Sequence, residues 1–300
     1  ELKIIILNEE MIYCENIEKI EESDRYIFLS RHVSEKKMPA LTAHFLGNPS
    51  NDSPYGGKAM NLAYTCPNLL KNYMINLYEQ KNKVENYEIT LEATHHGPTN
   101  ISKPCLFVEI GSQSKQWQDS IAGEIVINSI IKSIENEKET NMIGYGFGGP
   151  HYSKKFTKLI IENKYSISGY ISRHYIKYFN QELLSQILNI SDQKIRYAFI
   201  DKKGLGKDKQ RIKQIIKKVK TGNMSINDVF SHYGIASLPF GGEGISGLGR
   251  LHGKEGLRSF CRTKSIVENK YNLIDEPWWF NRTKRMENLL KNAISFLYKW

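Results

Sequence analysis

Apolar residues along the chain alternate between short strand-like runs and stretches with helical spacing. The pattern predicts strands over Leu2–Leu7, Arg25–Leu29, Tyr87–Ala93, Cys105–Ile110, Ile167–Ile171 and Ile195–Ile200. It predicts helices from Pro67 to about Gln80 and over Ser114–Glu135, Ser153–Asn163, Glu182–Leu188 and Asp208–Lys220. Strands that alternate with helices are typical of layered folds. The expected fold class is therefore α/β, with a mostly parallel or mixed central sheet and flanking helices.

The pattern changes after Lys220. Thr221–Arg250 is punctuated by glycine, and Trp278–Trp300 carries an apolar helical stripe on an otherwise polar segment. We therefore expect a first domain over residues 1–220 and a small, irregular, basic extension over residues 221–300. A plain packing helix is the preferred interpretation of the last stripe, with a helix lying on a membrane surface as the alternative.

Length and composition exclude several classes of protein. The 300 residues are enough to bury a sizeable core, and no apolar run approaches the roughly 18 residues of a membrane span. The four cysteines contain no Cys-x-x-Cys pair, which argues against a disulfide framework and against a cysteine-based zinc finger. A reducing, cytoplasmic location is expected.

The net charge of +10 is unevenly distributed along the chain. Residues 1–203 hold 24 Lys+Arg and 24 Asp+Glu, whereas residues 204–300 hold 18 and 8. The basic last third suits contact with a polyanion or a membrane surface, and solvated lysine-rich faces are an equally good interpretation.

Histidines and carboxylates gather where apolar strands end. Glu92 is followed by His95, His96 and the turn-forming Gly97-Pro98, and Glu109 closes the next strand. Strand alternation places His95 and His96 on opposite faces, but the turn allows both imidazoles to converge. Since ligands bind at the carboxyl ends of strands in α/β sheets, these side chains are candidates for one site at a sheet edge.

A glycine-rich stretch, residues 146–153, leads to the start of a helix and contains His151. Amide groups at such a turn bind anions, so Gly148 and Gly149 are candidates for contact with an oxyanion or a phosphate. The stretch lacks the Gly-x-Gly-x-x-Gly pattern, and no dinucleotide is expected. Histidines with carboxylates and without thiolates favour a hydrolytic metal site, most often zinc, although a non-catalytic role for the cluster stays open.

Residues 1–220 resemble the archaeal and plant type of D-aminoacyl-tRNA deacylase. The resemblance lies in several motifs in one order: Ser30-Arg-His32, Leu41-Thr-Ala-His44, Gly47-Asn-Pro49, Glu92-Ala-Thr-His-His-Gly-Pro-Thr99, Phe107-Val-Glu-Ile-Gly-Ser112, Trp117, Gly146-Phe-Gly-Gly-Pro-His-Tyr-Ser153, Phe156-Thr157 and Ser172-Arg-His-Tyr175. It implies a zinc-dependent esterase that frees D-amino acids from tRNA, with a fold akin to peptidyl-tRNA hydrolases and nucleoside phosphorylases.

Ester hydrolysis needs an activated water, a base or metal, and donors for the oxyanion. We take His95, His96 and His151 as candidate metal ligands, and His96, Glu92 and Glu109 as candidate catalytic groups. Cations that follow the glycine-rich stretch or belong to the basic helix are candidates for tRNA contact: Lys154, Lys155, Lys158, Lys207 and Arg211. An ordinary solvated helix face explains these cations equally well.

Residues 221–270 resemble instead the C-terminal end of an aldehyde dehydrogenase, through Leu238-Pro-Phe-Gly-Gly242 and Ser246-Gly-Leu-Gly-Arg250. That family's NAD-binding domain and catalytic groups lie upstream of such a segment, where this chain carries the deacylase-like unit. No dehydrogenase activity is therefore expected.

Two rivals to D-aminoacyl-tRNA hydrolysis stay open. One is an esterase of the peptidyl-tRNA hydrolase type, and the other is a non-catalytic module for tRNA binding or oligomerisation. The oligomeric state is not determined by the sequence, with a monomer favoured.

Overall fold

A computed structural model describes residues 2–34, 37–210, 212, 236–237, 241, 249, 251–259 and 283–297. The chain divides into two compact units, Glu1–Ser259 and Phe260–Trp300. The boundary that we expect at residue 220 lies outside the described residues. Among the residues described in the second unit is one helix, α10 (Lys284–Leu297).

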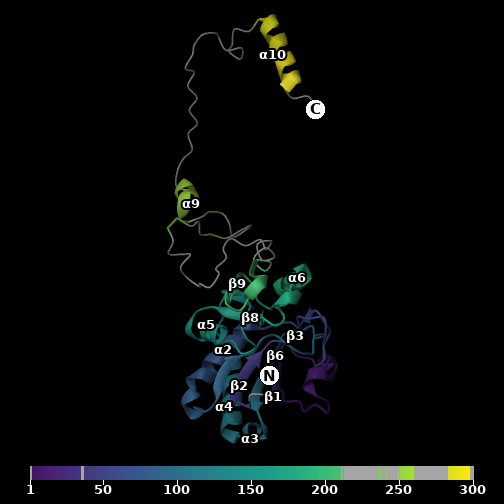
Figure 1. Ribbon diagram of the computed structural model, residues 1–300, viewed down its shortest axis with the longest axis vertical. Helices are drawn as coiled ribbons and strands as arrows, with labels where there is room; N and C mark the ends of the chain where they lie inside the picture. The colour runs from purple at the N-terminus through teal and green to yellow at the C-terminus, as the bar shows by residue number, and fades with distance from the viewer. Residues whose placement is uncertain are drawn as a thin grey trace. The chain divides into compact units, whose positions relative to one another are not determined.

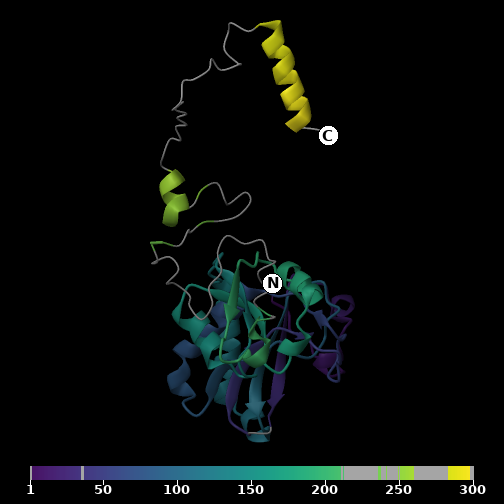
Figure 2. The ribbon, with the colours of Figure 1, turned by 45° about the horizontal axis from the view of Figure 1, so that its top comes forward.

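The first unit contains two larger sheets and a short ribbon, which can be followed in Figure 1 and, from another side, in Figure 2. The four-stranded sheet has the order β1 (Tyr26–Val33), β6 (Cys105–Ser112), β2 (Ala40–His44) and β5 (Glu88–Leu91). β1 is parallel to β6 and β2 is parallel to β5, but β2 and β6 are antiparallel. The α/β class with a mixed sheet is thus confirmed.

The second sheet is fully parallel, with the order β8 (Ser166–Ile171), β7 (Ile143–Phe147) and β9 (Tyr197–Ile200). β3 (Gly47–Asn48) and β4 (Asn61–Leu62) form the antiparallel ribbon. Among its described residues, the first unit also contains α1 (Ile17–Ile20), α2 (Pro67–Glu79), α3 (Ser114–Trp117), α4 (Ser120–Glu135), α5 (Lys154–Glu162), α6 (Gln181–Asn189), α9 (Gly253–Ser259) and the short 3-10 turns η1 (Met11–Tyr13), η2 (Lys81–Lys83), η3 (Ile176–Tyr178) and η4 (Gly206–Asp208). Among the described residues, no helix has the length and apolar character needed to cross a membrane.

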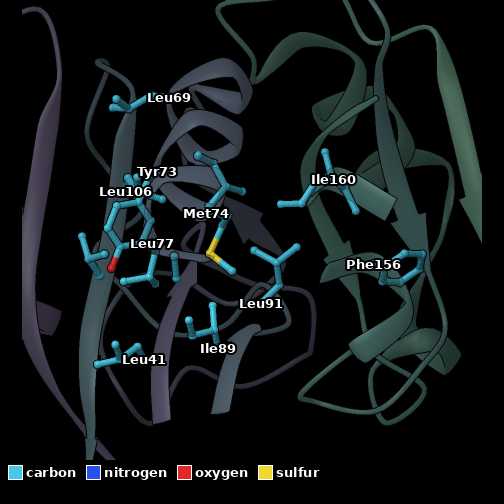
Figure 3. Packing of buried hydrophobic residues seen from close by; sticks show 14 of the residues in the cluster. Leu41, Leu69, Tyr73, Met74, Leu77, Ile89, Leu91, Leu106, Phe156 and Ile160 are labelled. Carbon is cyan, nitrogen blue, oxygen red and sulfur yellow. The ribbon is translucent and has the colours of Figure 1, made fainter. Parts of the chain in front are cut away.

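Helix α2 is the centre of the main hydrophobic core. It contacts α4, α5, β2, β5 and β8, so its buried side chains reach elements of both sheets. Leu69, Tyr73 and Met74 pack in one cluster with Leu91 of β5 and Ile160 of α5 (Figure 3). The apolar residues of α2 occur on more than one side because the helix is covered on more than one side.

Several boundaries differ from those expected. Leu2–Leu7 is not a strand; no regular structure is assigned there, and Ile4 and Ile6 are largely exposed. The helix expected over Ser114–Glu135 is two helices, since Asp119 caps the second one by accepting hydrogen bonds from the amides of Ile121 and Ala122.

Two strands that the apolar pattern did not indicate are β2 and β7. All five residues of β2 are buried, so no alternation with polar residues is visible. In β7 the glycines conceal the strand, but the packing requires them. A Cβ at Gly144 would lie 2.3 Å from the Phe199 ring, and one at Gly146 would lie 2.5 Å from the Tyr170 Cβ.

Candidate active site

The candidate site lies where the chain passes from the four-stranded sheet to the parallel sheet. The Glu92 amide donates to the Ala43 carbonyl of β2, and the Thr94 amide donates to the Tyr170 carbonyl of β8. Between them, the Ala93 amide donates to the His151 carbonyl over 2.9 Å. These bonds hold residues 92–94 against the loop that carries His151.

Two strands of the mixed sheet contribute further groups from one face. Thr42 of β2 and Glu109 of β6 are register partners, and His44 pairs with Phe107. Ala43 and Val108 belong to the core beneath α2 and α4, so alternation places His44 and Glu109 on the other face. The site is therefore built on a sheet face and not only at the carboxyl edge that the sequence suggested.

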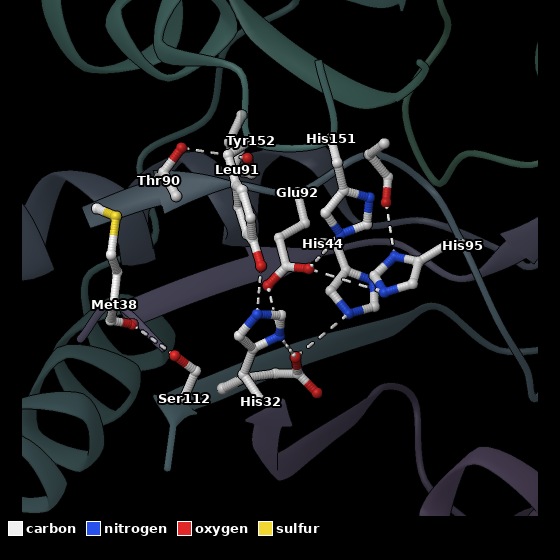
Figure 4. Close-up of polar contacts among 12 residues, drawn as sticks. His32, Met38, His44, Thr90, Leu91, Glu92, His95, Ser112, His151 and Tyr152 are labelled. Carbon is white, nitrogen blue, oxygen red and sulfur yellow. Dashed lines mark hydrogen bonds and ion pairs between the residues drawn. The ribbon is translucent and has the colours of Figure 1, made fainter. Parts of the chain in front are cut away.

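Two carboxylates and one imidazole form the most buried part of the site (Figure 4). His32 Nδ1 lies 3.1 Å from Glu109 Oε2 and 3.2 Å from Glu92 Oε1. The Tyr152 hydroxyl contacts the other ring nitrogen of His32. Burial opposes charge on His32, but the hydrogen bond to Glu109 and the charges of both carboxylates raise its pKa.

Four further imidazoles surround this group. The ring centroid of His95 lies 4.2 Å from that of His44, 4.4 Å from that of His96 and 4.7 Å from that of His151. His96 has a φ of 44°, a left-handed conformation that is uncommon for a residue with a side chain. This bend breaks the strand alternation, which explains why His95 and His96 share one side.

Backbone carbonyls fix the ring orientation of three of these histidines. Nδ1 of His44 lies 3.2 Å from the Phe45 carbonyl oxygen, and Nδ1 of His95 and of His96 each lies 2.7 Å from a carbonyl, of Ala93 and Gly97 respectively. A carbonyl accepts only from a protonated nitrogen, so each neutral ring keeps its lone pair on Nε2. Ligating histidines in metal sites are oriented in the same way.

Electrostatics keep the same three rings neutral. Burial, together with the nearby His96, lowers the pKa of His44 to about 3. Burial also lowers the pKa of His96, and burial with the neighbouring histidines lowers that of His95 further. Burial acts to raise the pKa of Glu92, but the hydrogen bond from His151 and the nearby His44 and His32 together lower it. Neutral imidazoles thus face an ionised carboxylate.

The donor atoms fall into three overlapping groups, each of which could hold a metal ion: His44, His95 and His96; Glu92, His95 and His151; and His32, Glu92 and Glu109. Within each group the donor atoms all lie within 4.8 Å of one another. His44 Nε2 is buried without a hydrogen-bond partner among the described residues. A buried lone pair without a donor is costly unless a cation completes it, so the residues fit a metal ion.

The structure brings together five of the expected site residues: Glu92, His95, His96, Glu109 and His151. The expected ligands do not form one set, because His96 groups with His44 whereas His151 groups with Glu92. We did not expect His32, His44 and Tyr152 in the site. The signal for the two histidines was present, since both end apolar runs in the motifs Ser30-Arg-His32 and Leu41-Thr-Ala-His44.

Of the two candidate anion-binding glycines, Gly148 does not fit that role. Its amide already donates to the Ile171 carbonyl over 2.9 Å, so it has no hydrogen to offer an anion. Gly149 has a φ of 86°. A Cβ at this position would lie 3.6 Å from the Asp201 carboxylate.

The expected tRNA-contacting lysines of α5 are exposed and ion-paired. Lys154 Nζ lies 3.3 Å from Glu88, Lys155 lies 2.6 Å from Asp201, and Lys158 lies 3.6 Å from Glu162. The carboxylate of Asp201 is buried, whereas Glu88 is half-buried and Glu162 is exposed. Exposed pairs contribute little stability, so Lys154 and Lys158 can exchange partners at low cost. Lys207 belongs to the turn η4, and Arg211 lies outside the described residues.

Comparison with known proteins identifies related sequences and a related fold. The sequence model of the D-aminoacyl-tRNA deacylase family matches residues 19–223, and that of the aldehyde dehydrogenase family matches residues 205–266. A D-aminoacyl-tRNA deacylase of Staphylothermus marinus is 37% identical over 191 residues, covering 63% of this chain and 69% of that protein. One of Methanocaldococcus jannaschii is 38% identical over 210 residues, covering 65% and 79%.

Among solved structures, the crystal structure of a conserved protein of unknown function has a TM-score of 0.67 and 29% sequence identity, covering 73% of this chain and 77% of its own. The fold and the sequence thus agree over the unit that carries the histidines and carboxylates. The chain belongs to the D-aminoacyl-tRNA deacylase family.

Proposed function

We propose that this protein hydrolyses the ester bond of D-aminoacyl-tRNA with the help of a bound zinc ion. The observation that carries the proposal is the set His44, His95 and His96. Each of these rings is bonded to a backbone carbonyl through Nδ1, so that its Nε2 is left for a ligand. Such sets of neutral imidazoles beside carboxylates suit zinc.

The ion would be held by His95, either with His44 and His96 or with His151 and Glu92. When bound, zinc polarises the ester carbonyl and lowers the pKa of water. Glu92 fixes the rings of His151 and His95 through its Oε2, at 2.8 Å and 3.7 Å. Glu109, at 3.1 Å from His32 Nδ1, would serve as the proton acceptor of the site. The Gly149 amide is the remaining candidate donor to the oxyanion.

tRNA as the substrate fits the exposed lysines of α5, and it implies the cytoplasm as the place of action. Lys154 and Lys158 supply the charge that a polyanion requires, because a phosphate can replace their partners, the half-buried Glu88 and the exposed Glu162, at low cost. We propose the same role for Lys207 and Arg211. The division into a deacylase unit over residues 1–220 and an extension over 221–300 is likewise a proposal.

The decisive experiment compares three substrates with the full chain: D-Tyr-tRNA, L-Tyr-tRNA and N-acetyl-L-Tyr-tRNA. Each is assayed with protein as isolated, after EDTA treatment, and after zinc is restored. We expect turnover of the D-ester only, loss after EDTA and recovery with zinc. Preference for the N-acetyl ester would instead indicate an esterase of the peptidyl-tRNA hydrolase type. Turnover that survives complete metal removal would contradict the role of zinc.

His96→Ala supplies the matching variant test. We expect a loss of turnover of at least about 100-fold while the melting temperature changes little, because the ring is partly exposed. An undiminished rate would remove His96 from the catalytic groups. tRNA binding by the unaltered protein without any turnover would favour the non-catalytic alternative.

A further inference from the structure

Three loops at the carboxyl edge of the parallel sheet pack against one another, backbone to backbone. The Arg173 amide, after β8, donates to the Gly149 carbonyl, after β7, over 2.9 Å. On the other side, a Cβ at Gly204, after β9, would lie only 2.1 Å from the Gly149 nitrogen. The loops that follow all three parallel strands therefore form one continuous surface.

This surface adjoins the candidate catalytic cluster. His151 comes two residues after Gly149, and its Nε2 lies 2.8 Å from Glu92 Oε2. Its side chain is 34% exposed, compared with 22% for His95 and 0% for His44. A substrate whose reacting bond reaches the cluster beside His151 therefore has this edge next to it.

The surface is positively charged. Arg173, Lys202 and Lys203 are exposed, and we call these three residues the basic rim. The acidic neighbour, Asp201, is buried and paired with Lys155 at 2.6 Å. Gly149 is buried between the loop after β8 and the loop after β9, and both loops contact its backbone. This packing brings Arg173, after β8, and Lys202 and Lys203, after β9, to the same edge of the sheet. Cations from two neighbouring loops can contact successive phosphates of one ribose-phosphate chain.

We infer that the basic rim binds phosphates of the acceptor end of tRNA next to the scissile ester. This inference rests on the proposed function and adds the part of the surface that holds the substrate's polyanion. Arg173 presents a planar fork of donors that matches a phosphate, and Lys203 adds a point charge. Neither has a carboxylate partner at ion-pair distance among the described residues.

The test uses the double variant Arg173→Ala/Lys203→Ala in the full chain. The matched control is Lys164→Ala/Lys194→Ala, which removes two exposed cations near the amino ends of the same strands β8 and β9. Binding of uncharged tRNA is measured by fluorescence anisotropy over a range of salt concentrations. The binding constant falls as salt rises, and each lost phosphate contact with a single strand makes the slope of log K against log salt shallower by about 0.7. We therefore expect the slope to become shallower by about 1.4 in the rim variant and to stay unchanged in the control.

Kinetics give the second measurement. We expect the KM for D-Tyr-tRNA to rise about tenfold in the rim variant. The control variant is expected to match the unaltered protein. D-tyrosyl-adenosine carries the same ester without phosphates, so its hydrolysis should not distinguish the rim variant from the control.

Three outcomes would overturn the inference. They are no tRNA binding by the unaltered protein, equal salt slopes for the rim and control variants, or an equal loss of D-Tyr-tRNA and D-tyrosyl-adenosine hydrolysis in the rim variant. The last would mean that the rim acts only by supporting His151. If the unaltered protein binds tRNA but does not hydrolyse D-Tyr-tRNA, the proposed function fails, and the binding series still decides the role of the rim.

Discussion

The carboxylates of Glu92 and Glu109, from strands that run in opposite directions, meet at the same ring nitrogen of His32. The two oxygens lie 3.2 Å and 3.1 Å from His32 Nδ1, and the two side chains are 0% and 5% exposed. Two buried like charges at such short range repel each other, so this imidazole is required to hold both in place.

His32→Ala is therefore expected to destabilise the metal-free protein by about 3–5 kcal/mol at neutral pH. In the variant, the pKa of one carboxyl rises above its unfolded value, so the folded state binds more protons than the unfolded state. Its stability relative to the unaltered protein should then fall as the pH rises from about 4 to about 7. Urea unfolding in EDTA at several pH values measures this. His174→Ala, at an exposed histidine, is the control, and a pH-independent difference would contradict the explanation.

His44→Gln is expected to reduce bound zinc and to lower kcat/KM by about 100-fold or more, because it removes a buried Nε2 lone pair from the cluster. Phe107→Leu is the matched control, since the Phe107 ring packs against those of His44 and His96 at 5.6 Å and 4.9 Å but offers no ligand. Metal analysis and deacylation assays are made on both variants. An equal loss of metal in both would mean that packing and not ligation is responsible.

Bound metal is expected to persist at acid pH. Burial lowers the pKa of His44 to about 3, and the pKa values of His95 and His96 are also lowered. A group with a lowered pKa stays neutral as the pH falls below 6.5, and protons then compete less with the metal. Dialysis at a series of pH values followed by metal analysis should show retention to about pH 5. Release centred near the ordinary imidazole value would contradict this.

Lys71 of α2 is expected to stabilise the end of α5. Its Nζ donates to the carbonyl oxygens of Ile160 and Tyr165 over 2.6 Å and 2.8 Å and also to that of Asn163. Lys71→Met leaves these carbonyls without their donor, which should cost about 2–4 kcal/mol in the free energy of unfolding. Lys132→Met, at an exposed ion pair on α4, is the control and should change it by about 0.5 kcal/mol or less.

The same lysine predicts a pH dependence. Burial lowers the pKa of Lys71 from 10.5 to about 8. Between these values the unfolded chain binds more protons than the folded protein, so the stability of the unaltered protein should rise with pH there. The rise should be smaller in Lys71→Met. Thermal unfolding from pH 8 to pH 10 compares the two, and parallel curves would contradict the prediction.

Local pattern alone was enough for most of the regular elements. Pro67 and the apolar spacing that follows it predict α2 nearly to the residue, and Ser153 caps α5 as expected. Caps and helical periodicity act within a few residues, so a sequence displays them directly. The fully buried β2 and the glycine-containing β7 were missed because their burial on both faces comes from neighbours distant in sequence. An apolar run likewise needs distant segments to cover it before it forms a strand, and Leu2–Leu7 is largely exposed and forms none.

The chemistry of the site was also visible in the sequence, as histidines and carboxylates at the ends of apolar runs. Which of them meet was decided by the tertiary structure. The antiparallel pairing of β2 with β6 brings His44 to the face of Glu109, and the bend at His96 turns its ring toward His95. Residue types and short spacings specify what a site can do, because they are properties of the chain itself. Pairing direction and register specify which residues form it, because they depend on contacts between segments far apart in the sequence.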